Sequence, residues 1–128
     1  MRRQRRADTT PELSVRRLLH RHGFRFRIHF SVPGLARRTI DIAFPRLRVA
    51  VFVDGCYWHG CPQHGTWPVA NANWWKAKLE GNRRRDRQTD AHLQAAGWSV
   101  VRIWEHEDPA TAVVELERLL RERRVKVR

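Results

Sequence analysis

Hydrophobic and polar residues alternate along the chain with two different periods, which divide it into seven segments. Apolar residues three or four apart predict helices, and apolar residues at every second position or in a short continuous run predict strands. The expected helices cover 9–23, 73–97 and the residues from 108 onward, and the expected strands cover 24–30, 38–44, 47–53 and 98–104. This order, α-β-β-β-α-β-α, predicts an α/β (α+β) domain around one sheet. The charged residues from Arg121 onward are expected to fray.

The start of the first helix carries a capping pattern. Thr9 and Glu12 have the spacing of a capping box, and Pro11 is tolerated in a first helical turn. Gly23 is expected to end this helix. Glu12 therefore has a structural role that must be weighed against any catalytic one.

Two acidic residues stand in or beside the predicted strands. In the first expected strand, apolar residues at even positions alternate with basic Arg25, Arg27 and His29. In the second, we expect one face to carry Ile40, Ile42 and Phe44 and the other to carry Thr39, Asp41 and Ala43. An aspartate is unfavourable inside a strand, and when buried it needs a partner or a metal. Asp54 closes the third strand, which is apolar enough to be central, so antiparallel pairing would bring both acids to one region.

The charge balance indicates a polyanion as partner. The chain has 128 residues, which suits one domain, and a net charge of +13. We expect a flexible basic arm over 1–8 and a single domain over 9–128. Four arginines crowd the segment 83–87 of the long helix. Nucleic acid fits this excess best, an acidic membrane surface fits it less well, and a compositional bias without function is the bland alternative.

The stretch 53–64 holds both cysteines of the chain and two of its seven histidines. Cys56, Cys61 and His64 form a C-x4-C-x2-H cluster, and thiolate and imidazole are the ligands that zinc prefers. A structural zinc site needs four ligands, and His106 is the candidate for the fourth. A disulfide between Cys56 and Cys61 is the alternative, which we rank lower because a histidine stands at ligand spacing.

The N-terminus suggests an intracellular protein. Met1 leads into a run of arginines with no apolar segment behind it, so we expect no secretory leader. No apolar run is long enough to span a membrane. We therefore expect a cytoplasmic, nucleoid-associated monomer.

The acids also suit hydrolysis of a phosphodiester. Magnesium prefers oxygen ligands, which Asp41, a backbone carbonyl near Val53 and phosphate oxygens could supply. His59 could take a proton from the attacking water, since imidazole titrates near neutral pH; its alternative role is zinc binding. For Asp54, a catalytic role and a structural one, as a strand-end cap or an arginine partner, have nearly even odds.

The sequence as a whole resembles a known family, the very-short-patch repair DNA mismatch endonucleases. The resemblance extends roughly from Asp8 to Asp108, and its central stretch is highly specific. The matching motifs are Asp8-Thr9-x-Pro11-Glu12-Leu13 with Arg16-Arg17-Leu18-Leu19, Asp41-x-x-Phe44-Pro45, Val51-Phe52-Val53-Asp54-Gly55-Cys56-Tyr57-Trp58-His59-Gly60-Cys61-Pro62, Trp75-x-x-Lys78-Leu79-x-x-Asn82-x-x-Arg85-Asp86, and Gly97-Trp98 with Val101, Trp104 and Glu105.

The resemblance implies a restriction-endonuclease-like fold, a mixed central sheet flanked by helices. It implies magnesium-dependent cutting of one DNA strand beside a T·G mismatch. The expected partners are double-stranded DNA that carries the mismatch and other mismatch-repair proteins. It assigns metal binding to Asp41, catalysis to His59 and an assisting role to Glu12. It also assigns zinc ligands at Cys56, Cys61 and His106, with His64 near the remaining one, and aromatics that wedge into the duplex at Tyr57, Trp58 and Trp75.

Four departures from the expected patterns affect these expectations. The best-known member has a histidine at the position of Asp54 and a cysteine at the position of His106. Restriction-like sites often have a lysine where this chain has Cys56. The N-terminal arm is also short, so affinity or mismatch preference can differ.

Two other functions stay open from the sequence. One is a nuclease of the same fold with a different DNA target. The other is a non-catalytic zinc DNA-binding module, which would need neither Asp41 nor His59; the presence of both argues against it.

Overall fold

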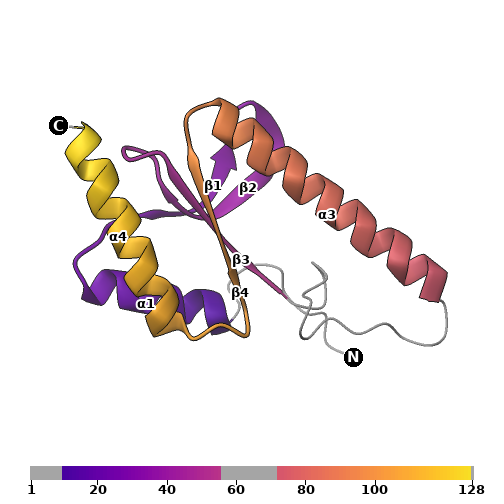
Figure 1. The fold of residues 1–128 in the computed structure, drawn as a ribbon, viewed down its shortest axis with the longest axis horizontal. Helices are drawn as coiled ribbons and strands as arrows, with labels where there is room; N and C mark the ends of the chain where they lie inside the picture. The colour runs from indigo at the N-terminus through magenta and orange to yellow at the C-terminus, as the bar shows by residue number, and fades with distance from the viewer. Residues whose placement is uncertain (1–9, 56–71, 128) are drawn as a thin grey trace.

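The computed structural model describes residues 10–55 and 72–127 (Figure 1). The elements are α1 (Thr10–Arg21), β1 (Arg27–Val32), β2 (Leu35–Phe44), β3 (Val49–Asp54), α3 (Ala72–Ala95), β4 (Ser99–Trp104) and α4 (Pro109–Val127). Within these described residues, the predicted order of elements is confirmed. The expected arm over 1–8 and most of the expected loop at 65–72 lie outside the described residues.

The four strands form one mixed sheet in the order β1-β2-β3-β4. β1 pairs with β2 and β2 pairs with β3 in antiparallel fashion, whereas β3 and β4 are parallel. Figure 1 shows α1 and α4 together on one side of the sheet and α3 on the other. The mixed α/β class expected from the sequence is therefore confirmed.

Each face of the sheet has its own hydrophobic core. Beneath α1 and α4, side chains of the sheet such as Val49 and Val51 pack against Val15, Leu19 and Leu116. Beneath α3, Leu93 packs among Val32, Ile40, Ala43, Ala50 and Phe52. Val49 and Val51 are 0% exposed, and full burial of such a side chain contributes about 1.5–3 kcal/mol. β3 is thus covered on both faces, as its continuous apolar sequence predicted.

The predicted alternation of β1 is wrong in part. The strand begins at Arg27 and not at residue 24, and Phe24 packs in the core before the strand starts. His29 has φ +50°, a backbone conformation that few side chains adopt. Ile28 is 43% exposed. β1 is an edge strand, and the unusual backbone at His29 interrupts its pleat, so the period of two is not kept.

The expected face of β2 also differs. Ile40 packs in the core under α3, whereas Ile42 and Phe44 pack under α1 and α4. Residues two apart in a regular strand share a face, so the pleat changes between Ile40 and Ile42, that is, at Asp41. This irregularity lies where the candidate site is found.

The expected fraying of the C-terminal tail is wrong, because α4 continues to Val127. Arg123 donates hydrogen bonds from Nε to the Leu47 carbonyl and from Nη2 to the Gly97 carbonyl, both at 2.9 Å. These bonds connect the last turns of α4 to the turn between β2 and β3 and to the turn between α3 and β4. Within the described residues, we find no helix that is long and apolar enough to cross a membrane.

Candidate active site

The central acid of the site lies where β2 and β3 separate. Their antiparallel pairing runs from Phe44↔Val49 to Ile42↔Val51. Beyond that pair, the Val53 backbone N–H donates a hydrogen bond of 2.8 Å to Oδ2 of Asp41. A side-chain oxygen thus takes the place of a backbone acceptor, so the strands part without leaving this donor unpaired. The carboxyl of Asp41 is held at the split between two core strands.

The environment of Asp41 raises the pKa of its carboxyl from the ordinary 3.8 to about 7. Burial is the main cause, because it disfavours the charged form. The hydrogen bond from Val53 opposes this effect, and the nearby carboxylates of Glu12 and Asp54 add to it. His29, on the neighbouring strand β1, lowers the pKa somewhat. The carboxylates of Glu12 and Asp54 therefore lie close enough to Asp41 to affect its pKa.

Glu12 comes to this place from the first turn of α1. Its side chain is 2% exposed, and Oε2 lies 3.1 Å from Nη2 of Arg16, four residues on in the same helix. Thr9, its expected capping partner, lies outside the described residues. The structure thus brings together two predicted site residues that lie 29 positions apart in the chain, Glu12 and Asp41, and it gives Glu12 an ion pair as well.

Asp54 is also buried, at 4% exposure, and it has an arginine partner. Nη1 of Arg102 lies 3.0 Å from each carboxylate oxygen of Asp54. Arg102 belongs to β4, which pairs with β3 in parallel. This contact is the structural role that the sequence left as one of two alternatives for Asp54.

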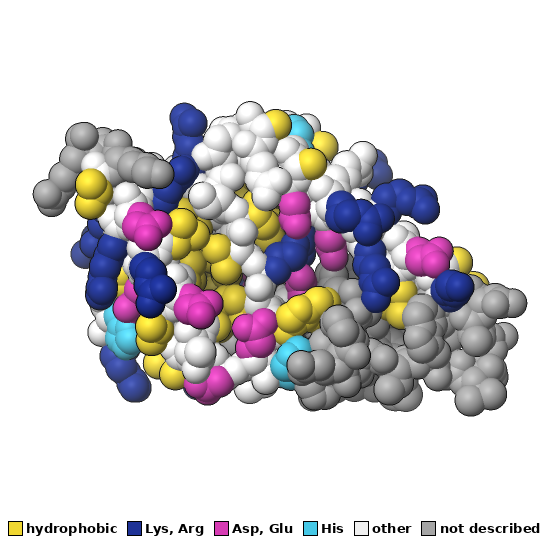
Figure 2. Space-filling view, in the orientation of Figure 1, with side chains coloured by type: hydrophobic (Ala, Val, Ile, Leu, Met, Phe, Trp, Pro, Cys, Tyr) yellow, Lys and Arg dark blue, Asp and Glu magenta, His cyan; other side chains and the backbone are white. Residues whose placement is uncertain are grey.

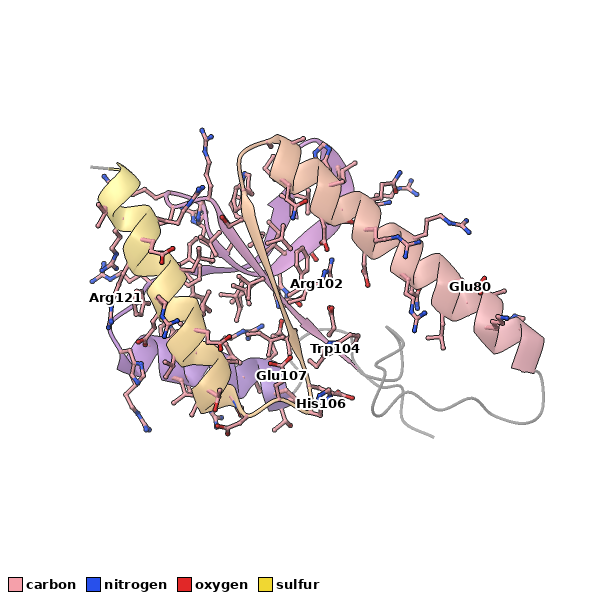
Figure 3. The ribbon with its side chains drawn as sticks, in the orientation of Figure 1. Glu80, Arg102, Trp104, His106, Glu107 and Arg121 are labelled. Atoms are coloured by element: carbon pink, nitrogen blue, oxygen red, sulfur yellow. The ribbon has the colours of Figure 1, made fainter. Side chains whose placement is uncertain are left out.

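Arg102 was not among the predicted site residues, yet it joins three elements. Its Nε and Nη2 bind Asp90 of α3 at 2.6–3.1 Å, and its guanidinium lies 4.3 Å from the centre of the Phe52 ring. Burial lowers its pKa, but the hydrogen bond to Asp90 and the charges of Asp54 and Asp86 outweigh this effect and raise it, so Arg102 stays charged. Figure 3 shows Arg102 on β4, with Trp104 and His106 following toward the end of that strand.

A signal for Arg102 was present in the sequence. It is the one charged residue in the otherwise apolar strand Ser99–Trp104. Asp86 and Asp90 lie one helical turn apart, so they share a face of α3. Only the structure shows that this face of α3 meets Arg102, through the contacts of Arg102 with Asp86 and Asp90.

These residues line an open cleft of about 210 Å³ between the sheet and α3. The cleft is lined by Arg37, Arg38, Thr39, Asp41, Phe52, Val53, Asp54, Arg85, Asp86, Thr89 and Arg102. Arg38 fixes its wall, because it donates to Thr89 Oγ1 at 2.9 Å and to Gln88 Oε1 at 2.7 Å. Arg37 and Arg85 are exposed at its mouth. The cleft therefore places cations around a group of carboxylates.

The helix α3 extends this cationic surface away from the sheet (Figure 1). Figure 2 shows Lys and Arg side chains gathered along α3. The exposed basic residues of the helix are Lys76, Lys78, Arg83, Arg84, Arg85 and Arg87. Trp74 is 58% exposed near the start of α3. The side chain of Trp75 is not among those described.

Most of the predicted zinc and aromatic residues lie outside the described part of the chain: Cys56, Tyr57, Trp58, His59, Cys61 and His64. Of the expected zinc ligands, only His106 is described. It is exposed, and its ring stacks on Trp104 with centroids 6.5 Å apart. Among the described residues, we find no group of three or more His, Cys, Asp or Glu side chains that could hold a metal.

The ends of β3 and β4 show where the predicted zinc motif begins. Asp54 pairs with Trp104, and the Glu105 N–H donates to the Asp54 carbonyl at 2.9 Å. Cys56 follows two residues after Asp54, and His106 follows two residues after Trp104. Asp54, two residues before Cys56 in the sequence, therefore lies directly beside the turn that carries His106.

A partly buried carboxyl at a strand split, with acids beside it and a basic helix along its cleft, is an arrangement that suits a hydrolase acting on a phosphodiester polyanion. The family described as DNA mismatch endonuclease Vsr matches residues 1–64, half of the chain. The chain belongs to this family. It is therefore an endonuclease, a hydrolase that acts on DNA.

Several individual proteins are also similar. The type II nicking enzyme V.NaeI of Lentzea aerocolonigenes is 43% identical over 88% of this chain and 69% of its own length. The type II nicking enzyme V.XorIIP of Xanthomonas oryzae pv. oryzae is 44% identical over 84% of this chain and 77% of its own length. The DNA mismatch endonuclease Vsr of Escherichia coli is 32% identical over 77% of this chain and 62% of its own length.

Proposed function

We propose that this endonuclease nicks one strand of double-stranded DNA beside a T·G mismatch, in very-short-patch mismatch repair, and that it requires magnesium. The observation that carries the proposal is the partly buried Asp41 at the β2–β3 split, close to Glu12 and Asp54. Similarity to a mismatch endonuclease and to nicking enzymes supports the substrate and the single cut. The mixed sheet with helices on both faces supports a restriction-endonuclease-like fold.

The residues around Asp41 fit a magnesium ion. A hard divalent cation is bound by one or two carboxylates together with waters and substrate phosphate oxygens, and Asp41 with the Val53 carbonyl offers such a partial set. The raised pKa of Asp41 agrees with this proposal, because a nearby cation would offset the cost of its partly buried negative charge. When bound, magnesium would stabilise the negative charge that develops on the phosphate.

His59, Glu12 and Asp54 take the remaining roles in the proposed reaction. His59 accepts a proton from the attacking water, since an imidazole can do so near neutral pH. Glu12, beside Asp41, assists by its charge. Asp54, predicted as catalytic, accepts hydrogen bonds at both carboxylate oxygens from Nη1 of Arg102, and its charge also raises the pKa of Asp41. These contacts favour a role in shaping the site over a direct role in proton transfer.

DNA is held by the cationic surface of the cleft. Arg37 and Arg85 are exposed at its mouth, and a guanidinium binds a phosphate through two parallel hydrogen bonds. The basic residues of α3 continue the same surface, which suits the spaced phosphates of a duplex. A basic arm over 1–8 would add further phosphate contacts to a single domain over 9–128, acting as a monomer on DNA in the cytoplasm.

A structural zinc completes the proposal. Cys56, Cys61, His64 and His106 supply its four ligands, and the neighbouring ends of β3 and β4 support this grouping. Tyr57 and Trp58, between two of these ligands, enter the base stack beside the mismatch with help from Trp75. Inserted side chains unstack a base step at a cost of a few kcal/mol, and a mismatched step opens most easily.

One assay tests the proposed function directly. End-labelled duplexes, identical except for one T·G pair, are incubated with magnesium or with EDTA. A single cut in one strand of the mismatched duplex, only with magnesium, is expected. Cutting of both strands, or cutting that persists in EDTA, would contradict it.

A nuclease with a different DNA target is the second candidate. This candidate is supported by two similar proteins, V.NaeI and V.XorIIP, which are named as nicking enzymes without reference to a mismatch. Equal nicking of matched and T·G duplexes in the same assay would establish this alternative. The earlier alternative of a non-catalytic module does not agree with membership of an endonuclease family.

A further inference from the structure

A second and larger hollow lies at the other end of the sheet. It has a volume of about 530 Å³ and is lined by Gly23, Phe24, Arg25, Phe44, Pro45, Arg46, Leu47 and Arg124. These residues come from the α1–β1 connection, the turn between β2 and β3, and α4. β3 runs from this turn to Asp54, and a six-residue strand spans roughly 17 Å. We call this hollow the turn pocket.

The turn pocket is distinct from the cleft at Asp41. The two share none of their lining residues. Phe24, Phe44 and Leu47 belong to the core beneath α1 and α4, whereas Phe52 of the cleft belongs to the core beneath α3. The two sites therefore lie on opposite faces of the sheet as well as at opposite ends of β3.

Aromatic and aliphatic side chains form the floor of the turn pocket. Phe24 is 5% exposed and Phe44 is 4% exposed. The guanidinium of Arg124 lies 5.0 Å from the centre of the Phe24 ring. An apolar floor that includes two aromatic rings, with a guanidinium over one of them, suits another planar ring, because both aromatic faces and guanidinium planes stack on bases.

The rim of the turn pocket is cationic and lacks carboxylate neighbours. Arg25, Arg46 and Arg124 are all exposed. In the described part of the chain none of these three makes an ion pair, whereas Arg16, Arg102 and Arg121 each contact a carboxylate. Three guanidinium groups around one hollow repel one another, and a bound anion would relieve that repulsion. The rim is thus suited to a phosphate.

Local bonds hold the pocket in this shape. Arg123, next to Arg124, binds the Leu47 and Gly97 carbonyls and so fixes α4 against the turn. The Leu47 N–H donates to the Phe44 carbonyl at 3.1 Å within the turn itself. Gly23 has φ +87°, where a side chain would be strained. A hollow that is already formed avoids much of the ordering cost of binding.

We propose that the turn pocket binds a nucleotide, with its phosphate on Arg25, Arg46 and Arg124 and its base on the apolar floor. The volume lies within the range of ordinary small-molecule sites, about 300–1,000 Å³. An acidic peptide would pair with the three arginines but would have no planar ring to stack on Phe24 and Phe44. The nucleotide is either free in solution or part of a single DNA strand, and both present the same chemistry.

Binding is tested without magnesium and without cleavage, so its result is independent of the proposed nicking activity. The full chain labelled with ¹⁵N is titrated with thymidine monophosphate, with a short oligothymidylate, with inorganic phosphate and with a hexaglutamate peptide. Amide signals of Gly23 and Arg46 are expected to shift with the two nucleotide ligands. Binding is expected to weaken about tenfold or more in Arg46→Ala, since one charge-assisted contact is worth that much.

Arg118→Ala is the matched control, because Arg118 is an exposed arginine on α4 that does not line the pocket. It should bind as the unchanged protein does. Should Arg46→Ala fail to fold, the double variant Arg25→Ala with Arg124→Ala replaces it, since both side chains are exposed.

The four ligands separate the outcomes. Tighter binding of the oligothymidylate assigns the pocket to a DNA strand, and equal or weaker binding assigns it to a free nucleotide; both support the proposal. Inorganic phosphate or hexaglutamate binding as tightly as the nucleotide would overturn it. Nucleotide affinity unchanged in the pocket variants would overturn it too.

Discussion

The Val53 backbone N–H binds Oδ2 of Asp41 at 2.8 Å across the point where β2 and β3 separate. This bond fixes the carboxyl while leaving its other oxygen available to a ligand, and it resists only part of the pKa rise that burial causes. A charged group that is costly to bury needs a compensating function or partner. The relationship of these two residues therefore underlies the first two predictions.

Replacing Asp41 with asparagine should abolish nicking while DNA binding stays nearly normal. An asparagine oxygen can still accept the bond from Val53, so the split between the strands is preserved. The negative charge that would hold magnesium is lost. Nicking rates and binding to a T·G duplex are measured side by side. Glu12→Gln is the comparison and should have a milder effect; wild-type nicking by Asp41→Asn would show that the site is misassigned.

The pKa of Asp41 predicts how stability changes with pH. The carboxyl has a pKa of about 7 in the folded protein and 3.8 ordinarily, so between these values the folded state holds a proton that the unfolded state has lost. The contribution of Asp41 to stability therefore falls as pH rises from about 4 to about 7, and is constant above that range. The total change is on the order of a few kcal/mol.

Denaturant unfolding at several pH values checks this sign. Asp41→Asn removes the titration, so its stability should exceed that of the unchanged protein at pH 8, and the difference should shrink toward pH 4. Magnesium should stabilise the unchanged protein at pH 8 but not the variant. A difference that is independent of pH would contradict the assignment.

Replacing Arg102 with alanine should destabilise the fold and weaken nicking together. Asp54 and Asp90 would lose their cation, and removing one partner of a buried ion pair typically costs about 3–5 kcal/mol. Arg102 is partly exposed, so the lower end of that range is expected. Arg87→Ala, on an exposed position of α3, is the matched control for loss of charge. A melting temperature unchanged in Arg102→Ala would show that the network does not join α3 to the sheet.

The sequence predicted the order of elements because periodicity depends on neighbouring residues alone. It also predicted that Asp41 and Asp54 share one region, which is confirmed because both line the same cleft. It could not predict the side on which Ile40 packs, because the pleat changes at the strand split, which depends on partner strands.

Long-range partners explain the other differences between sequence and structure. The last turns of α4 looked too charged to stay helical, but Arg123 binds carbonyls of Leu47 and Gly97, which are distant in the chain. Arg102 lies in a mostly apolar strand, and its partners Asp54 and Asp90 are distant from it in the sequence. Polar residues whose partners lie far along the chain carry little local signal.

A structural zinc predicts that metal content and stability change together. Purified protein should contain one zinc per chain, and Cys61→Ser should lose it along with stability and activity, because metal binding energy is then folding energy. His106→Ala should do the same, and replacing the neighbouring exposed Glu107 should not. Metal analysis and thermal unfolding measure both properties. Protein without zinc, or with a disulfide between Cys56 and Cys61, would contradict this prediction.

Tyr57→Ala should separate mismatch recognition from general DNA binding. We expect the aromatic pair Tyr57 and Trp58 to project toward DNA, where stacking on a base is worth ~1–3 kcal/mol by alanine substitution. Binding to a T·G duplex should therefore weaken by about tenfold, with a smaller loss on matched DNA. Arg85→Ala is the contrasting variant: Arg85 is exposed at the cleft, and loss of a phosphate contact should weaken binding to both duplexes alike. Equal losses in Tyr57→Ala, or a large drop in its melting temperature, would mean that Tyr57 is a packing residue and does not read the mismatch.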